Sequence, residues 1–242
     1  MPALAFVLVE RAVPPDPIEL VRRAASFGCK LVHEGGTQSP ATYSIGGGGI
    51  LMVMLIDAPH PDAPKMTPSL VAPTAEDLQR AKAHYIVVLM DGPTAQREQD
   101  ILLARLTAAV VRSSPAVAAM LGHGICFHRA GFFAEIVEAE DDLPMMVCVD
   151  ITRAPEPDER MSMLTHGLVR YGREEFFVTA SQGGKAAMDF IVGLARWMLM
   201  DPNKQLPTGD TVGRTPHEKV RVQRVPNPTG EGPEVIRLDL DL

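Results

Sequence analysis

Polar residues that could carry out acid–base chemistry gather in the C-terminal third of the chain. Thr165 and His166 precede a Gly-Leu pair, Glu175 follows shortly after, and Asp210 lies in the sequence Gly-Asp-Thr-Val-Gly. One histidine and two carboxylates supply the acid and the base that hydrolysis or group transfer requires. We therefore take His166, Glu175 and Asp210 as candidate catalytic residues, and His84, which opens an apolar run, as a second candidate histidine.

Three neighbours of this set are candidates for binding a ligand or a partner: Thr165, Arg173 and Thr211. A structural role is the alternative, because Asp and Gly are the usual turn formers. Thr165 and the adjacent His166 would also point to opposite faces of a strand, so that at most part of the set shares one face. We favour the structural role, in which glycines permit a hairpin turn and the Arg and Glu side chains face solvent.

Metal and phosphate sites have weaker support. His123, Cys126 and His128 lie close together, but only the last two share a face of an extended strand, and no second ligand pair has the spacing of a zinc site. The glycine run 46–49 lacks the Lys-Ser/Thr of a phosphate-binding loop, and no helix follows it directly. Gly-x-Ser-x-Gly and other common catalytic signatures are absent from the sequence. The sequence therefore predicts no metal ion and no cofactor.

Residues 163–179 and 209–213 together resemble a bacterial family known as domain of unknown function 4261. That family carries a Thr-x-Gly-Leu-x-x-Phe-Gly-x-x-Glu block, an apolar helix and a Gly-Asp-Thr-Ile-Gly-like turn. The matching residues of the block are Thr165, Gly167, Leu168, Tyr171, Gly172 and Glu175, followed by the helix 186–200 and the turn 209–213. Ala81 replaces the first His of an upstream strand, and Cys148 replaces the Trp of another. The resemblance extends over residues 3–225 and implies a shared fold and no particular activity.

Composition excludes several classes of protein. With 46% apolar residues among 242, the chain can bury the sizeable core of a globular protein. Its net charge of −7 gives no long-range attraction to nucleic acid or to anionic membranes. The apolar runs are too short or too charged to span a bilayer, and the first residues have no signal-peptide pattern. Three scattered cysteines provide no disulfide framework, so we expect a cytoplasmic protein without nucleic-acid or membrane partners.

Hydrophobic periodicity and turn residues predict an α+β fold with a mixed, mainly antiparallel sheet and three main helices. The helices are expected at 18–27, 96–112 and 186–199, the first with Asp16 as its N-cap. Strands are expected at 4–9, 41–45, 50–56, 84–90, 122–128, 145–152, 219–225 and 235–242, and a hairpin pairs 164–170 with 174–179. The order strand, helix, strand, strand occurs twice, which suggests a duplicated unit.

We expect a single α+β domain over residues 1–225, followed by a linker and a C-terminal strand over residues 226–242. The proline-rich stretch 57–75 is predicted to be a mobile surface loop. Residues 131–139 fit either a strand or a helix.

Two features suggest contacts with a protein partner. The strand Val235–Leu242 carries apolar residues on one face, and it either closes the chain's own sheet or pairs with an edge on another subunit in a homo-oligomer. Methionines such as Met52 and Met54 crowd the strands, and we favour core filling over the alternative of an adaptable protein-binding face.

The sequence leaves two classes of function open. The first, which we favour, is a non-catalytic protein-interaction domain that neutralises a partner protein. The second is a hydrolase or transferase of an unrecognised type that uses His166 or His84 with Glu175 and Asp210.

Overall fold

The computed structural model describes residues 2–35, 39–68, 70–156, 160–181, 184–201, 203–215 and 217–240. Contacts divide the chain into two compact units, Met1–Cys148 and Val149–Leu242. This division falls well before residue 225, where the sequence suggested that a single domain ends. Both units combine helices with mainly antiparallel sheets, which confirms the predicted α+β class.

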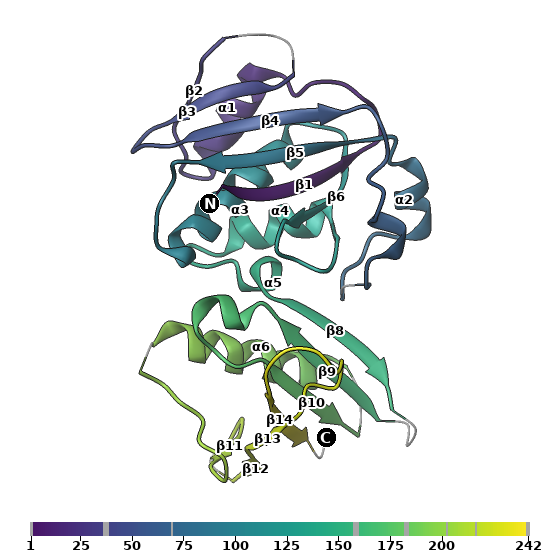
Figure 1. Ribbon diagram of the computed structural model, residues 1–242, viewed down its shortest axis with the longest axis vertical. Helices are drawn as coiled ribbons and strands as arrows, with labels where there is room; N and C mark the ends of the chain where they lie inside the picture. The colour runs from purple at the N-terminus through teal and green to yellow at the C-terminus, as the bar shows by residue number, and fades with distance from the viewer. Residues whose placement is uncertain are drawn as a thin grey trace. The chain divides into compact units, whose positions relative to one another are not determined.

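The first unit is built on a seven-stranded antiparallel sheet with the strand order β2-β3-β4-β5-β1-β6-β7. The strands are β1 (Ala3–Val9), β2 (Leu31–His33), β3 (Ala41–Ile45), β4 (Ile50–Ile56), β5 (Ala83–Met90), β6 (Ala116–Leu121) and β7 (His128–Arg129). Figure 1 shows helices α1 (Pro17–Ser26), α3 (Gln96–Arg112) and α4 (Ala130–Ala139) on one side of this sheet. The short helix α5 (Met145–Cys148) ends the unit.

The helices of the first unit follow from local signals in the sequence. Asp16 caps α1 by accepting a hydrogen bond from the Ile18 amide at 2.9 Å, and Pro17 begins the helix, as predicted. The helix ends at Phe27 because Gly28 adopts a φ of +76°. Val7, Leu51 and other inward-facing strand residues are fully or almost fully buried, so the core of the unit lies between the sheet and its helices.

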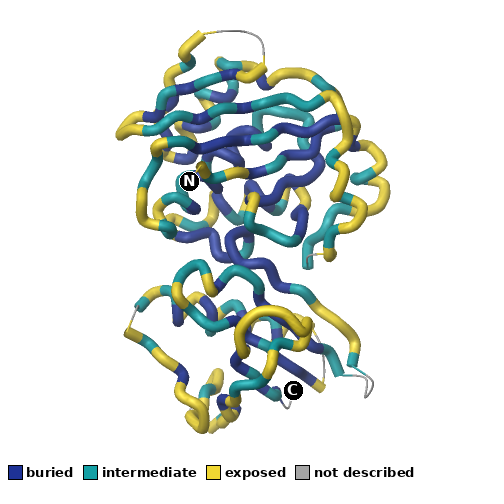
Figure 2. The backbone as a smooth tube through the Cα atoms, viewed as in Figure 1, coloured by how far each residue is buried: buried dark blue, intermediate teal, exposed yellow. Residues whose placement is uncertain are grey.

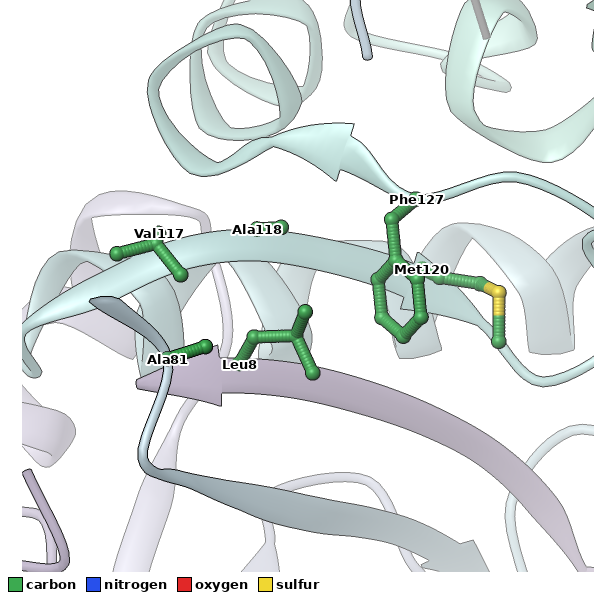
Figure 3. Close-up of a cluster of buried hydrophobic side chains, with 6 residues drawn as sticks. All are labelled: Leu8, Ala81, Val117, Ala118, Met120 and Phe127. Carbon is green, nitrogen blue, oxygen red and sulfur yellow. The ribbon is translucent and has the colours of Figure 1, made fainter. Parts of the chain in front are cut away.

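Among the described residues, the opposite side of the sheet is covered near β1, β6 and the start of β5. There the segment 57–82, which contains the 3-10 helix η1 (Ala63–Lys65) and helix α2 (Ala75–Arg80), packs against a buried cluster of Leu8, Ala81, Val117, Ala118, Met120 and Phe127 (Figure 3). Met66 and Leu78 are among the residues of this segment that contact the cluster. The proline-rich stretch predicted to be a mobile surface loop is therefore part of a hydrophobic cover, with Ser69 outside the described residues.

His60 ties this cover to the sheet. Its ring centroid lies 4.9 Å from that of Phe6, 5.1 Å from that of His84 and 5.5 Å from that of Phe127. Its Nδ1 accepts a hydrogen bond from the Asp62 amide at 3.3 Å. Burial first, and the neighbouring His84 second, hold the pKa of His60 below its usual value, while Asp62 opposes this shift. The neutral imidazole is thus the form that the fold accommodates.

We predict that the cover loosens as the solution becomes acidic. A histidine with a lowered folded-state pKa contributes stability above its unfolded pKa, near 6.5, and this contribution is lost as pH falls below that value and through the lower folded-state pKa. Hydrogen exchange of residues 57–68, corrected for intrinsic rates, should show declining protection between about pH 7 and pH 5. His60→Phe keeps the ring contacts and should remove this pH dependence. Equal protection of the wild type at both ends of the range would contradict the prediction.

The second unit is built on a five-stranded sheet with the order β13-β14-β10-β9-β8. Its strands are β8 (Asp150–Pro155), β9 (Met161–His166), β10 (Phe176–Ala180), β13 (Gln223–Val225) and β14 (Val235–Leu240). Helix α6 (Lys185–Met200) packs on β10, and β11 (Thr211–Val212) pairs with β12 (Val220–Arg221) in a small separate sheet. The predicted hairpin is confirmed as β9 and β10, which are antiparallel and are joined through the 3-10 helix η2 (Leu168–Tyr171).

The C-terminal strand lies inside this sheet. β14 runs parallel to β10 over Ile236–Leu240 and antiparallel to β13 over Val235–Arg237. Ile236 and Leu238 are fully buried. The sequence left two possibilities open, and the structure shows that β14 closes the chain's own sheet. Where β14 already pairs with β10 or β13, it cannot pair with a strand of another subunit. Asp241 and Leu242 lie outside the described residues.

We predict that Leu238→Ala destabilises the second unit by about 3 kcal/mol, because it leaves a cavity at a fully buried position of a central strand. Trp197 is the only tryptophan of the chain and belongs to α6, so its fluorescence reports the unfolding of this unit in urea. Glu234→Ala, at an exposed position next to β14, should change the free energy of unfolding by less than about 0.5 kcal/mol. Similar midpoints for the two variants would refute the assignment of β14 to the core.

Three sequence predictions in the first unit need correction or completion. The strand expected at 122–128 lies instead at Ala116–Leu121, and only the two residues of β7 follow it. The strand expected at 145–152 begins as α5 and becomes extended only from Asp150, because Pro144 starts a helical turn in which its carbonyl accepts the Val147 amide. The ambiguous segment is the helix α4.

The predicted repeat of strand, helix, strand, strand is not reproduced, because three strands (β2, β3 and β4) follow α1 and two (β6 and β7) follow α3. After α1 the chain enters β2 at the edge of the sheet, whereas after α3 it enters β6 directly beside β1. The two halves therefore do not occupy equivalent places in the sheet.

No helix among the described residues is long and apolar enough to cross a membrane.

Candidate functional site

Glu175 is the centre of the polar cluster that the sequence singled out. Its side chain accepts hydrogen bonds from the Thr165 hydroxyl at 2.6 Å, from the Gly167 amide at 2.7 Å and from the Val169 amide at 3.3 Å. Thr165 Oγ1 in turn accepts the Phe176 amide at 2.8 Å. Glu175 is only 7% exposed and Thr165 is fully buried. These groups form a closed hydrogen-bonded latch between the end of β9 and the start of β10.

The latch explains the residue types of this block. Gly167 has a φ of +123° and Gly172 a φ of +71°, conformations that favour glycine. The 3-10 helix η2 starts at a glycine, which offers no side-chain cap, and the Glu175 carboxylate supplies the missing acceptors. Burial raises the pKa of Glu175, while the hydrogen bonds from Thr165 and the η2 amides oppose the shift. The arrangement satisfies backbone groups, and its acceptors are already in use.

We predict that Glu175→Ala destabilises the second unit by about 3 kcal/mol, because it leaves the Thr165 hydroxyl and the Gly167 and Val169 amides without their acceptor. Glu175→Gln should lower the free energy of unfolding by less than half as much, since its side-chain amide oxygen still accepts hydrogen bonds. The folded-state pKa of Glu175 is raised, so its stabilising contribution is present below about pH 4.5 and declines as pH rises through the folded value. Only the wild type should show this decline in Trp197-monitored urea unfolding.

Glu231→Ala provides a control, because it removes an exposed carboxylate from the same unit. It should leave the free energy of unfolding unchanged to within about 0.5 kcal/mol. A Glu175→Ala protein as stable as this control would show that the latch does not hold the turn.

His166 lies apart from the latch. Its Nε2 is 3.0 Å from the Thr152 hydroxyl on β8, and its neighbour Thr165 bonds to Glu175 instead. Burial lowers the pKa of His166, and Asp150 opposes this. Successive side chains of a strand point to opposite faces, as the sequence predicted for this pair. The structure therefore brings Thr165 and Glu175 together and assigns His166 to a contact between β8 and β9.

Arg173 and Glu174 connect the same turn to other parts of the unit. The guanidinium of Arg173 donates to the carbonyls of Asp201 at 2.5 Å and Lys204 at 2.9 Å, just after α6. Glu174 accepts two hydrogen bonds of 2.7 Å from Arg224 on β13. The prediction that these Arg and Glu side chains simply face solvent is therefore wrong. Arg173, proposed as a binding residue, holds the chain after α6 in place.

Asp210 and Thr211 are exposed and line a groove of about 490 Å³ beside α6. The turn is structural in part, because the Asp210 carbonyl accepts the Val222 amide at 2.8 Å and the Gly213 Cα lies too close to Glu218 for a side chain. Trp197, 41% exposed, lines the same groove and has Lys204 Nζ 4.5 Å from its ring centroid. Two candidates from the sequence, Asp210 and Thr211, therefore line this groove together with the only tryptophan. Glu175 and His166 are not among its lining residues.

His84 belongs to the first unit, where it is 6% exposed. Its Nδ1 donates to the Ala58 carbonyl at 2.8 Å, and its ring contacts His60. The strand position predicted for His84 is confirmed by β5. The histidine thus helps to anchor the cover to the sheet.

The described part of the chain contains no group of three or more His, Cys, Asp or Glu residues that could hold a metal ion. His123 instead contacts the Cys148 carbonyl at 3.2 Å, while Cys126 is fully buried and His128 is 4% exposed. The glycine run forms the β3–β4 connection and lines a wide depression with Lys30 and Arg105. Neither pattern assembles a site.

The surface that stands out most in the structure was not predicted from the sequence. Cross-strand partners place Thr42, Met52, Val88 and Leu4 in one row across the uncovered side of the sheet. Parallel rows are formed by Val32, Ser44, Ile50 and Met90, and by Met54 and Ile86. We call the apolar members the open face: Leu4, Val32, Ile50, Met52, Met54, Ile86, Val88 and Met90.

The open face is partly accessible. Val32 is 62% and Leu4 39% exposed, Val88 is 9% exposed, and the other members have intermediate accessibility. Figure 2 shows this intermediate burial along β4, the strand that carries Met52 and Met54. An antiparallel sheet that faces water normally carries polar side chains on that side. Here apolar side chains remain, although β4 already buries Leu51 and Val53 on its other side.

A signal for this surface exists in the sequence. The run Ile50–Ile56 is apolar at every position, so it has no alternation of apolar and polar residues that would show which side of the strand is covered. Its methionines nevertheless suggested the alternative of an adaptable face.

Comparison of the chain with protein-family models, with curated proteins and with solved structures found no match.

Proposed function

We propose that this protein works by binding another protein chain through the open face of its first unit, without catalysing a reaction. The carrying observation is the set of eight apolar side chains, interrupted only by Thr42 and Ser44, on the side of the sheet opposite its helices. One residue occupies about 4.8 Å by 6.8 Å of a sheet face, so the eight apolar positions of the open face cover on the order of 300 Å². That area is comparable with the lower end for the largest apolar patch of a monomer, and such a patch is often functional.

The composition of the open face suits protein binding. Met52, Met54 and Met90 have flexible, polarizable side chains that adapt to the shape of a partner. The sheet beneath them is held by ladders on both sides of β4, β5 and β1, so the backbone that presents them is rigid. A rigid surface loses little conformational entropy on binding.

The candidate catalytic residues support the non-catalytic part of the proposal. Glu175 uses its acceptors on Thr165 and the η2 amides, and His166 contacts Thr152 on a neighbouring strand. General acid–base partners must reach one substrate within hydrogen-bond distance. The hydrolase or transferase alternative has no comparable observation in its favour, and neutralisation of a partner stays a prediction.

Two further statements are part of the proposal. We propose membership of the family of domain of unknown function 4261, supported by the resemblance of its Thr-x-Gly-Leu and Glu block, which is a single hydrogen-bonded unit in this chain. We also propose a cytoplasmic location. What supports it is that Cys29, Cys126 and Cys148 are buried in the first unit, where they serve as small hydrophobic residues.

We predict that a photo-crosslinking amino acid at position 52 joins this protein to one discrete protein chain in cells that produce it. The same group at position 200 is the matched control, because Met200 is an even more exposed methionine at 70% but lies in α6. Adding Met54→Lys to the position-52 protein should abolish the crosslink, since a charge at the contact must be desolvated. Equal labelling from positions 52 and 200, or none from 52, would overturn the proposal.

A further inference from the structure

The second unit contains a pocket of about 790 Å³ between the turn after η2 and the chain that follows α6. We propose that this pocket binds a small organic molecule with two negative charges, either a phosphate monoester or a dicarboxylate. Its volume lies in the range of about 300 to 1,000 Å³ that is usual for small-molecule sites. None of its lining residues belongs to the first unit, which carries the open face.

The charge of the pocket is opposite to that of the chain. Three cationic side chains and one carboxylate line it: Arg173, Lys204, Arg224 and Glu174. They leave an excess of two positive charges, although the chain as a whole has a net charge of −7. Like charges gathered in a hollow of the surface repel one another and attract counter-ions. A bound dianion would neutralise this excess.

Arg173 and Lys204 supply the positive charge that the chain itself does not balance. Arg224 is neutralised by Glu174, through two hydrogen bonds of 2.7 Å. Arg173 instead donates to the carbonyls of Asp201 and Lys204, which carry no net charge. Among the residues that the structure describes, no carboxylate forms an ion pair with Arg173 or with Lys204.

The two cations are suited to anionic oxygens. The carbonyl bonds of Arg173 hold its guanidinium in one orientation and occupy two of the five N–H groups of the fork. A fixed guanidinium matches the oxygens of a phosphate or carboxylate group, and the Lys204 ammonium adds three donors. Apolar residues such as Val169, which is 49% exposed, and Pro207 line the same pocket. They offer a surface for the organic part of the ligand.

Trp197 provides a signal for binding at Lys204. The Nζ of Lys204 lies 4.5 Å from the centroid of the Trp197 ring, an attractive contact between a cation and an aromatic face. Trp197 is the only tryptophan, and it does not line the pocket itself. An anion that bonds to the ammonium weakens its attraction to the ring. Ligand binding should therefore change the fluorescence of Trp197.

Isothermal titration calorimetry of the full chain tests the inference with phenyl phosphate and phthalate as separate probes. At about pH 8 and constant ionic strength, both probes are dianions. At least one should bind, and its binding should change Trp197 fluorescence over the same range of concentration. Benzoate, which has the same ring and a single carboxylate, should bind roughly tenfold more weakly than that probe or not at all. Tighter binding of phenyl phosphate identifies a phosphate monoester as the ligand class, and tighter binding of phthalate identifies a dicarboxylate.

Variants at Lys204 locate the binding. Lys204→Ala should raise the dissociation constant of the bound probe roughly tenfold, because it removes a charge-assisted hydrogen bond. Lys204→Arg keeps the positive charge and should keep the constant within about threefold of the wild-type value. Lys219→Ala is the matched control, because it removes an exposed lysine of the same unit that does not line the pocket. Urea unfolding shows whether each variant retains its fold.

Three results would show that the pocket is not a dianion site. The first is no binding of either dianion at concentrations up to about 10 mM. The second is binding of benzoate that is as tight as that of the dianions. The third is a loss of affinity in Lys219→Ala that equals the loss in Lys204→Ala. None of these results bears on the open face, which the crosslinking experiment tests separately.

Discussion

The constraint on which the first unit depends is that a sheet has two faces and its helices cover only one. α1, α3 and α4 bury one side of the seven strands, and the chain spends residues 57–82 on covering part of the other. That cover reaches β1, β6 and the start of β5 and is anchored by the ring contacts of His60. The rows on β3, β4 and β5 remain outside it. An apolar surface left uncovered in this way has a free-energy cost in water, which association would remove.

The second unit depends on a different interaction, the burial of one carboxylate among backbone donors. The Glu175 carboxylate allows a tight turn next to a buried strand end. It accepts hydrogen bonds from amides that find no acceptor within η2 or on its glycine cap. Arg173 and Glu174, its sequence neighbours, fasten the same turn to the residues after α6 and to β13. Three adjacent polar residues thus link the hairpin to two other segments. Their hydrogen bonds go to backbone groups, to the Thr165 hydroxyl and to the ion pair with Arg224.

Local features of the sequence were sufficient for the three main helices and for the strands β3 and β4. Asp16 with Pro17, and Gly28 after the last turn, define α1 through interactions between near neighbours. β6 was misplaced because its alanine-rich sequence, Ala-Val-Ala-Ala-Met-Leu, has little strand propensity. Its pairing with β1 overrides that propensity, and pairing between segments so far apart leaves no local trace.

The polar cluster shows the same limit at the level of a site. Residue types predicted that Thr165 and His166 face opposite ways, because side-chain alternation is a property of any strand. They could not show that Glu175 would be buried and would cap η2, since this requires the folded turn. Nor could they place Asp210 in a groove with Trp197 instead of beside Glu175.

The sequence by itself determined the class of fold, the three main helices and the alternation of faces, because these depend on residues within a few positions of one another. Only the tertiary structure decided that β14 is an inner strand and that Ile50–Ile56 is covered on one side and open on the other. An apolar run indicates that burial of its side chains is favourable. It does not indicate which other segment of the chain will cover them. That depends on where distant parts of the chain come to rest.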